Sequence, residues 1–220
     1  MKKVVKILAS VFVYCVLLSA SIPKGPNIEK LPEYNDCNEW SKYVIYVDFS
    51  KSSCSDRLFI YDVGVEPELI YSGVVLHGCG GKSTPSKPEF SNEIGSNCSS
   101  LGEYTLEGTV RMKNGMEAIK LKGWSDTNSN AEARNIYIHP CTMATLLPFN
   151  LPGLNFPLTK ASEGCFAVSY HTYDVIKYCM NKDIEISDNF NLLQNENRHD
   201  RTKLKAFYYG KTDNRRMERN

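Results

Sequence analysis

Apolar residues recur along most of the chain in short runs, each bounded by glycine, proline, asparagine or serine. Runs of this length between turn-forming residues predict β-strands. The predicted strands are residues 43–49, 57–63, 69–76, 102–110, 118–121, 135–139 and 204–209. Many short strands separated by turns predict a mainly β fold, built as a sandwich or a barrel-like sheet.

One segment places its apolar residues at helical spacing. Within residues 172–180, Val175, Ile176 and Cys179 share one face by three- and four-residue spacing, which predicts a helix. A shorter helical turn is predicted over residues 142–147, because Pro148 would end it. We therefore expect one or two short helices beside the strands.

Two long segments carry neither pattern. Residues 78–101 are rich in glycine and serine and carry two prolines, and residues 148–163 carry three prolines and Gly153. Irregular loops of this length are uncommon inside a compact domain, and those that occur often cover a binding site. We predict that both loops are lids.

The first twenty residues have the order of a secretory signal peptide: a basic start, an apolar run over 7–18 and the small residues Ser19 and Ala20. The apolar run of about 12 residues is shorter than the roughly 20 that span a bilayer, so no permanent membrane span is expected. The predicted organisation is a signal peptide over 1–20, a linker over 21–39, one domain over 40–210 and a polar tail over 211–220.

Composition and charge limit the possible partners. The chain has 220 residues, enough for one well-buried core, and a formal net charge of +1. Removing the leader with its three lysines takes this charge to −2. Such a weak net charge gives no reason to expect binding to nucleic acid or to anionic lipid.

Cysteines are numerous for a chain of this length. Loss of Cys15 with the leader leaves seven: Cys37, Cys54, Cys79, Cys98, Cys141, Cys165 and Cys179. Exported thiols tend to pair, so an odd number leaves at least one thiol that is free or joined to another chain. Counting alone does not identify that thiol.

The sequence Gly164-Cys165 lies where a polar loop meets an apolar run. Glycine allows a sharp turn, and the amides of such a turn can face a carbonyl oxygen. A thiol there needs a base in order to act near neutral pH. His139 ends a predicted strand and His77 directly follows one, so either could approach Cys165 if its strand were a neighbour in the sheet.

A zinc site is the competing interpretation. The sequences His77-Gly78-Cys79 and His139-Pro140-Cys141 each place two ligand types on one side of an extended chain. Neither pair has the wider spacing of common zinc sites, and exported thiols are readily oxidised. We therefore expect no metal and no cofactor.

The order of a histidine at a strand end, a long loop, Ser162-x-Gly164-Cys165 and an apolar strand resembles the L,D-transpeptidase (YkuD-type) catalytic domain. Further landmarks in matching order resemble its murein L,D-transpeptidase subgroup. They are residues 47–50, 57–62, 77–78, 90–92, 95–96, 99–102 and 128–139. Two positions depart from the family pattern: Pro140 stands where glycine usually follows the histidine, and Ala167 stands where better-known members have arginine.

This resemblance implies a cysteine acyltransferase on peptidoglycan stem peptides. With the predicted signal peptide, the expected location is the periplasm or cell envelope. Cys165 would be the nucleophile and His139 its base, with Gly164 at the oxyanion site. His77, Ser99 and Ser162 would position substrate, and carbapenem-type β-lactams would be ligands. Two alternatives remain at this point: an L,D-carboxypeptidase or trimming peptidase on the same peptides, and an inactive disulfide-rich binding protein.

Overall fold

The computed structural model describes residues 25, 27, 42–142, 144, 162–194 and 205–209. The predicted signal peptide, the tail over 211–220, most of the linker and most of the second predicted loop lie outside these residues. Within the described part of the chain, no helix is both long enough and apolar enough to cross a membrane.

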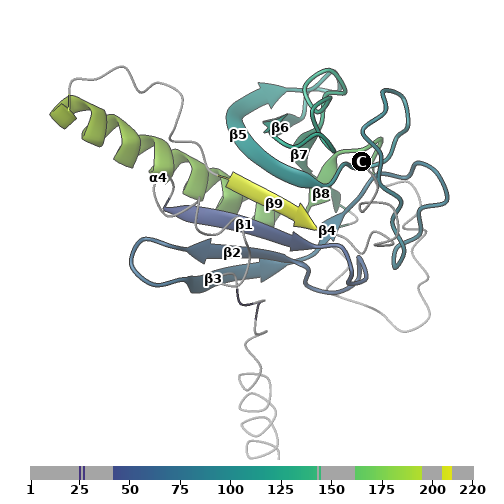
Figure 1. The fold of residues 1–220 in the computed structure, drawn as a ribbon, viewed down its shortest axis with the longest axis horizontal. Helices are drawn as coiled ribbons and strands as arrows, with labels where there is room; N and C mark the ends of the chain where they lie inside the picture. The colour runs from purple at the N-terminus through teal and green to yellow at the C-terminus, as the bar shows by residue number, and fades with distance from the viewer. Residues whose placement is uncertain are drawn as a thin grey trace, which may run out of the picture.

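The described residues form nine strands in one hydrogen-bonded sheet, which confirms the mainly β fold (Figure 1). The strands are β1 Tyr43–Asp48, β2 Leu58–Asp62, β3 Glu68–Gly73, β4 Val75–Leu76, β5 Gly102–Arg111, β6 Glu117–Gly123, β7 Tyr137–Pro140, β8 Phe166–Val168 and β9 Lys205–Tyr209. Their order in the sheet is β3-β2-β1-β9-β5-β6-β7-β8-β4.

The two edge strands of this sheet, β3 and β4, are consecutive in the chain, with Val74 alone between them. The prediction of a single strand over 69–76 is therefore wrong. The chain changes partner at Val74, from β2 to β8 (Leu58↔Gly73, then Val75↔Val168). Because the residues on both sides of Val74 are buried, the apolar pattern runs through this change without a break. The resulting sheet curves back toward its own first edge, as barrel-like sheets do.

Strand β5 bends strongly along its length (Figure 1). Its pairing with β6 shifts register between Leu106 and Thr109, and Gly108 within this interval has a φ of +103°. A bulge with glycine in this conformation increases local twist and bends the strand. The bend turns β6 and β7 away from the plane of β1 and β2, which shapes the region where the candidate site lies.

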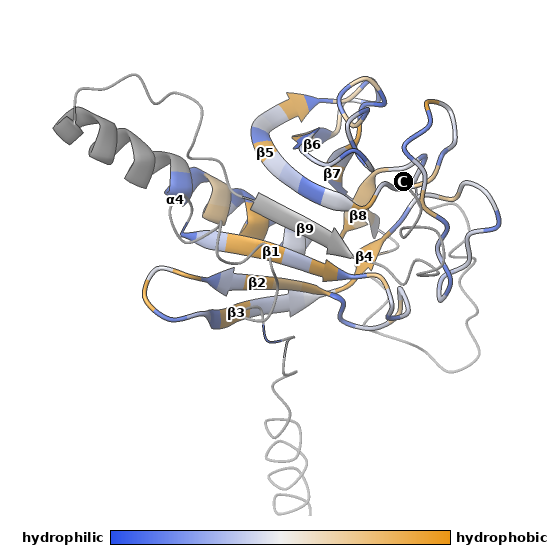
Figure 2. Cartoon of the chain, in the orientation of Figure 1, coloured by the Kyte–Doolittle hydropathy of each residue, from blue (hydrophilic) through white to orange (hydrophobic). Residues whose placement is uncertain are grey.

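The main core lies between the curved sheet and one long helix. Alternate residues of β1, Tyr43, Ile45 and Val47, point into this core, while Val44 and Tyr46 pack on the other face with β2. The apolar colours in Figure 2 accordingly gather in the strands, and the loops are mostly hydrophilic. Burial of these side chains is the main contribution to the stability of the sheet.

Helix α4, Tyr170–Gln194, covers the core face of the sheet and contacts β7 and β1. Ser169 caps it, since its Oγ accepts the amide of Thr172 at 2.9 Å. Ile176 and Cys179 are buried and Val175 packs against them, which confirms the predicted face. The helix is longer than predicted, because it continues past residue 180 to Gln194. Of the predicted turn over 142–147, Thr142 and Ala144 are described, and both are helical.

A fully buried arginine ties β2 to β4 and to the loop that follows. The Nε and Nη2 of Arg57 donate to the carbonyl of Val75 at 2.8 and 2.6 Å. Nη2 also lies 2.8 Å from Nδ1 of His77. A guanidinium has only donors, so Nδ1 accepts and the proton of neutral His77 sits on Nε2. The guanidinium lies 4.7 Å from the ring centre of Phe49, which adds a cation–π contact.

The burial of His77 beside Arg57 predicts that the stability of the folded protein depends on pH. Burial, followed by the charge of Arg57, lowers the pKa of His77 to about 4 from its ordinary value of 6.5. Between pH 6.5 and pH 4, His77 is protonated in the unfolded chain but neutral in the folded protein. Its full contribution to the free energy of unfolding is therefore present above pH 6.5 and falls as the pH drops toward 4. The loss is on the order of 3 kcal/mol.

Urea unfolding between pH 7 and pH 4 measures this loss. His77→Asn retains an acceptor for Arg57 but does not titrate, so the variant should lose less unfolding free energy over this range than the wild type. Parallel pH curves for the two proteins would contradict the assignment.

Candidate active site

The sheet brings Cys165 and His139 to the same face. Strand β8 pairs in parallel with β7, with His139 opposite Ala167 and Ile138 opposite Phe166. Ile138 and Phe166 point into the main core. Since side chains alternate along a strand, His139 and Ala167 point to the other face. Cys165 precedes Ala167 by two residues and lies on that face too.

Both side chains line one open cavity of about 730 Å³. Its walls come from four places: the loop at residues 94–97, the β5–β6 hairpin at 111–114, the segment 133–139 and the turn 162–165. The first predicted loop, 78–101, therefore contributes a wall to the cavity. A pocket of this size is typical of sites for small molecules and short peptides.

The structure distinguishes between the two histidines that could act as the base for Cys165. Strand β4, which ends directly before His77, flanks β8 on the side opposite β7. Both histidines are therefore carried by neighbours of the strand that follows Cys165. His77, however, is buried, packs edge-on against Phe49 at 6.1 Å and does not line the cavity. Of the two, only His139 shares the cavity with Cys165.

The tautomer of His139 suits a base. Its Nδ1 lies 3.1 Å from the carbonyl oxygen of Pro140, which can only accept a hydrogen bond. Nδ1 therefore carries the proton, and Nε2 keeps its lone pair. The proline that departs from the family pattern thus supplies, through its carbonyl, the group that orients the imidazole.

Cys165 is held as a neutral thiol. Its Sγ donates to the backbone oxygen of Asn135 at 3.5 Å, and only 9% of the residue is exposed. Burial raises the pKa of the Cys165 thiol, while a backbone hydrogen bond from Tyr137 and the charge of Arg134 oppose this effect. A thiol with a raised pKa needs a base at the moment of reaction.

Glycine is required immediately before the cysteine. Gly164 has a φ of +118°, and a Cβ there would lie 3.0 Å from both the Cys98 oxygen and Ile136 Cδ1. Two serines hold this turn. Ser162 lines the cavity and donates to the Cys165 oxygen at 2.6 Å.

Ser99, the second of these serines, lies behind the turn. Its hydroxyl donates to the Gly164 oxygen at 2.9 Å and accepts the Gly78 amide at 2.9 Å. Ser99 is fully buried and does not line the cavity. In this structure, Ser99 supports the backbone behind the turn and His77 contacts the side chains of Arg57 and Ser53. Ser162, by contrast, faces the cavity.

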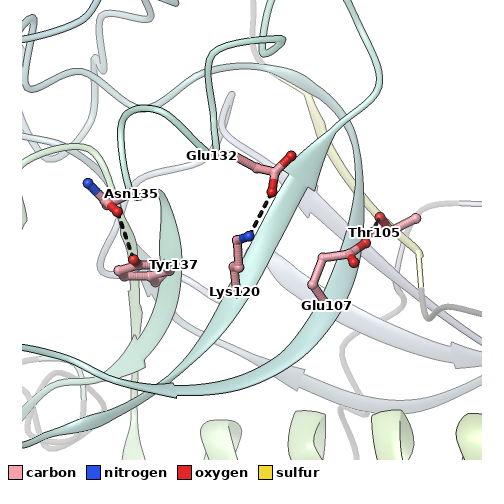
Figure 3. Close-up of polar contacts among 6 residues, drawn as sticks. All are labelled: Thr105, Glu107, Lys120, Glu132, Asn135 and Tyr137. Atoms are coloured by element: carbon pink, nitrogen blue, oxygen red, sulfur yellow. Dashed lines mark hydrogen bonds and ion pairs between the residues drawn. The ribbon is translucent and has the colours of Figure 1, made fainter.

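The sequence patterns did not single out the residues that hold the thiol from the other side. Asn135 has a φ of +55°, and the Tyr137 hydroxyl donates to its Oδ1 at 2.9 Å (Figure 3). This bond fixes the residue whose backbone oxygen receives the thiol. Asn135, the first residue of a predicted strand, was the available signal, because asparagine tolerates the left-handed conformation better than most residues.

Arg134 fastens the loop wall to the same segment. Its Nη1 donates to the Ser91 oxygen at 2.7 Å and to Ser100 Oγ at 2.6 Å. Its Nη2 contacts Ser96 Oγ at 3.3 Å and the Cys98 oxygen. Arg134 therefore orders the loop and also places a positive charge near Cys165.

The described residues do not assemble the zinc site considered from the sequence. Among them, no group of three or more His, Cys, Asp or Glu side chains could hold a metal ion. His77 and His139 face opposite sides of the sheet. The described cysteines, Cys165 included, form no disulfide bond.

Substitution of Ser99 tests whether its two hydrogen bonds support the turn. Ser99→Ala leaves a buried carbonyl and a buried amide without their partner, which should lower the free energy of unfolding by about 2 to 4 kcal/mol. The turn that presents Cys165 also loses its support, so the rate of Cys165 acylation should fall about tenfold.

Denaturant unfolding and single-turnover acylation measure the two effects. Ser86→Ala is the matched control, since Ser86 is exposed and makes no side-chain hydrogen bond with the described residues. If Ser99→Ala behaved like this control, the supporting role would be wrong.

Comparison with known protein families gives a match over most of the chain. The family model described as the L,D-transpeptidase catalytic domain matches residues 26–186, well over half of the chain. No curated protein matches the sequence. The matched segment contains the strands β1 to β8, the loop wall, His139 and Cys165. The chain belongs to the L,D-transpeptidase catalytic domain family.

Proposed function

We propose that this protein is a cysteine acyltransferase on peptidoglycan stem peptides, with Cys165 as the nucleophile and His139 as the general base. The observation that carries the proposal is the placement of both side chains on one face of neighbouring strands, at a common cavity. Family membership supports an L,D-transpeptidase-type activity related to peptidoglycan.

In the first half-reaction, Nε2 of His139 takes the thiol proton as Sγ of Cys165 attacks the carbonyl carbon of the bond to the terminal D-residue. The backbone amides of Gly164 and Cys165 donate to the resulting oxyanion, a type of contact typically worth about 2.7–4 kcal/mol. Collapse forms a thioester, and the imidazolium gives its proton to the departing amine.

In the second half-reaction, the amine of another stem peptide attacks the thioester. His139 accepts a proton from this amine, the thiol of Cys165 is regenerated, and a new amide bond joins the two peptides. Water in place of the amine would give a carboxypeptidase from the same intermediate. A carbapenem-type β-lactam would acylate the same sulfur.

We also propose that the protein acts in the periplasm or cell envelope after cleavage near Ala20. Support comes from the basic, apolar and small-residue order of residues 1–20. This location would provide access to the proposed substrate.

The central test uses purified tetrapeptide muropeptides and mass spectrometry of both products and protein. The wild type is expected to form an acyl adduct on Cys165 and a crosslinked dimer. Cys165→Ala should abolish both, and His139→Gln should lower the acylation rate by about 10² to 10⁴.

Folding of each variant is checked by circular dichroism, so that loss of activity is not loss of structure. Formation of a shortened tripeptide without a crosslinked dimer would show that the protein is a carboxypeptidase and not a transferase. Absence of any Cys165-dependent product from folded wild type would favour the inactive binding protein.

A further inference from the structure

The lining of the cavity has more cationic than anionic side chains. Arg111, Lys113 and Arg134 contribute positive charge to its lining, and Glu163 is the only acidic side chain among the lining residues described. Opposite charges concentrate at a cleft lined by one sign. An excess of cations therefore favours a ligand with a negative charge.

Arg134 is not free to bind that ligand. Both of its Nη atoms already donate to acceptors of the loop wall, namely Ser91, Ser96, Cys98 and Ser100. Breaking these bonds would release the loop and leave buried acceptors unsatisfied. Recognition of an anion then falls to the two remaining cations.

Arg111 and Lys113 are exposed at the β5–β6 hairpin. Arg111 makes one long hydrogen bond, 3.3 Å from Nη1 to the Gly115 oxygen, and Lys113 makes no hydrogen bond or ion pair with the described residues. The hairpin itself is well ordered by hydrogen bonds between Met112 and Met116 at 2.8 Å and from Gly115 to Met112 at 2.9 Å. Two cations with unused donors are thus held on a defined turn.

Apolar side chains lie beside these cations. Ile94, a large aliphatic residue that is 70% exposed, lines the same cavity, as does Met112. Exposed aliphatic surface at a cavity is suited to a small apolar group. The wall therefore combines an aliphatic surface with two cations, which fits a small residue that ends in a carboxylate.

We propose that Arg111 and Lys113 bind the terminal carboxylate of the peptide donor and so select peptides whose last residue has a free acid. This inference rests on the proposed function. The carboxylate belongs to the residue that departs, so it lies only a few bonds from the carbonyl that Cys165 attacks. Guanidinium and ammonium groups bind carboxylates through charge-assisted hydrogen bonds, and a neutral amide would not replace them.

Calorimetry with the Cys165→Ala protein tests this selection without turnover. The probes are a synthetic stem tetrapeptide with a free C-terminal carboxylate and the same peptide with a C-terminal amide. The acid is expected to bind at least about tenfold more tightly than the amide, as loss of one charged hydrogen bond implies. Adding Arg111→Gln and Lys113→Gln should bring the acid to the affinity of the amide.

The matched control carries Lys82→Gln and Lys87→Gln, which remove the same charge from exposed positions that do not line the cavity. This control should keep the preference for the acid. Equal binding of acid and amide before substitution, or a preference that survives in the Arg111→Gln, Lys113→Gln protein, would overturn the inference.

Acylation of the wild type separates this failure from failure of the proposed function. A thioester on Cys165 with both peptides, at equal rates, would overturn carboxylate selection and leave the acyltransferase intact. No thioester with either peptide would overturn the proposed function, and the inference with it.

Discussion

The parallel pairing of β8 with β7 is the constraint on which the site depends. It sets His139 beside Ala167 and sends Cys165 to the same face, so one register determines the geometry of the proposed catalytic pair. A shift by one residue would turn the cysteine into the core and bring Phe166 out of it. Burial of Ile138 and Phe166 fixes this register. The hydrophobic effect thereby determines where the side chains of Cys165 and His139 lie.

Around this pairing, buried polar groups hold the irregular segments that strands alone would not order. Arg57 ties β2 and β4 to the loop start, Ser99 joins that loop to Gly164, and Arg134 fastens its far end. Each group has its partners, and low local dielectric strengthens such satisfied contacts. Segments far apart in the sequence are thereby held together around the proposed site.

Much of this could be predicted from the sequence, because strands and nucleophile leave local signals. Short apolar runs bounded by turn-forming residues indicated the strands, and Gly164-Cys165 indicated a turn that presents a thiol. The change of partner at Val74 left no signal, since it alters pairing and not burial. The choice between His77 and His139, like the role of Arg134, depends on which face each side chain takes after distant strands pair.

The central claim is that Cys165 rests as a neutral thiol that His139 deprotonates during reaction. The rate of its alkylation by iodoacetamide, measured against pH by mass spectrometry of the Cys165 peptide, tests this most directly. Burial raises the pKa of this thiol above its ordinary value of 9.0, so the rate should still be rising at pH 9 in folded protein. A plateau reached below pH 7 would contradict the account, because it would reveal a preformed thiolate–imidazolium pair.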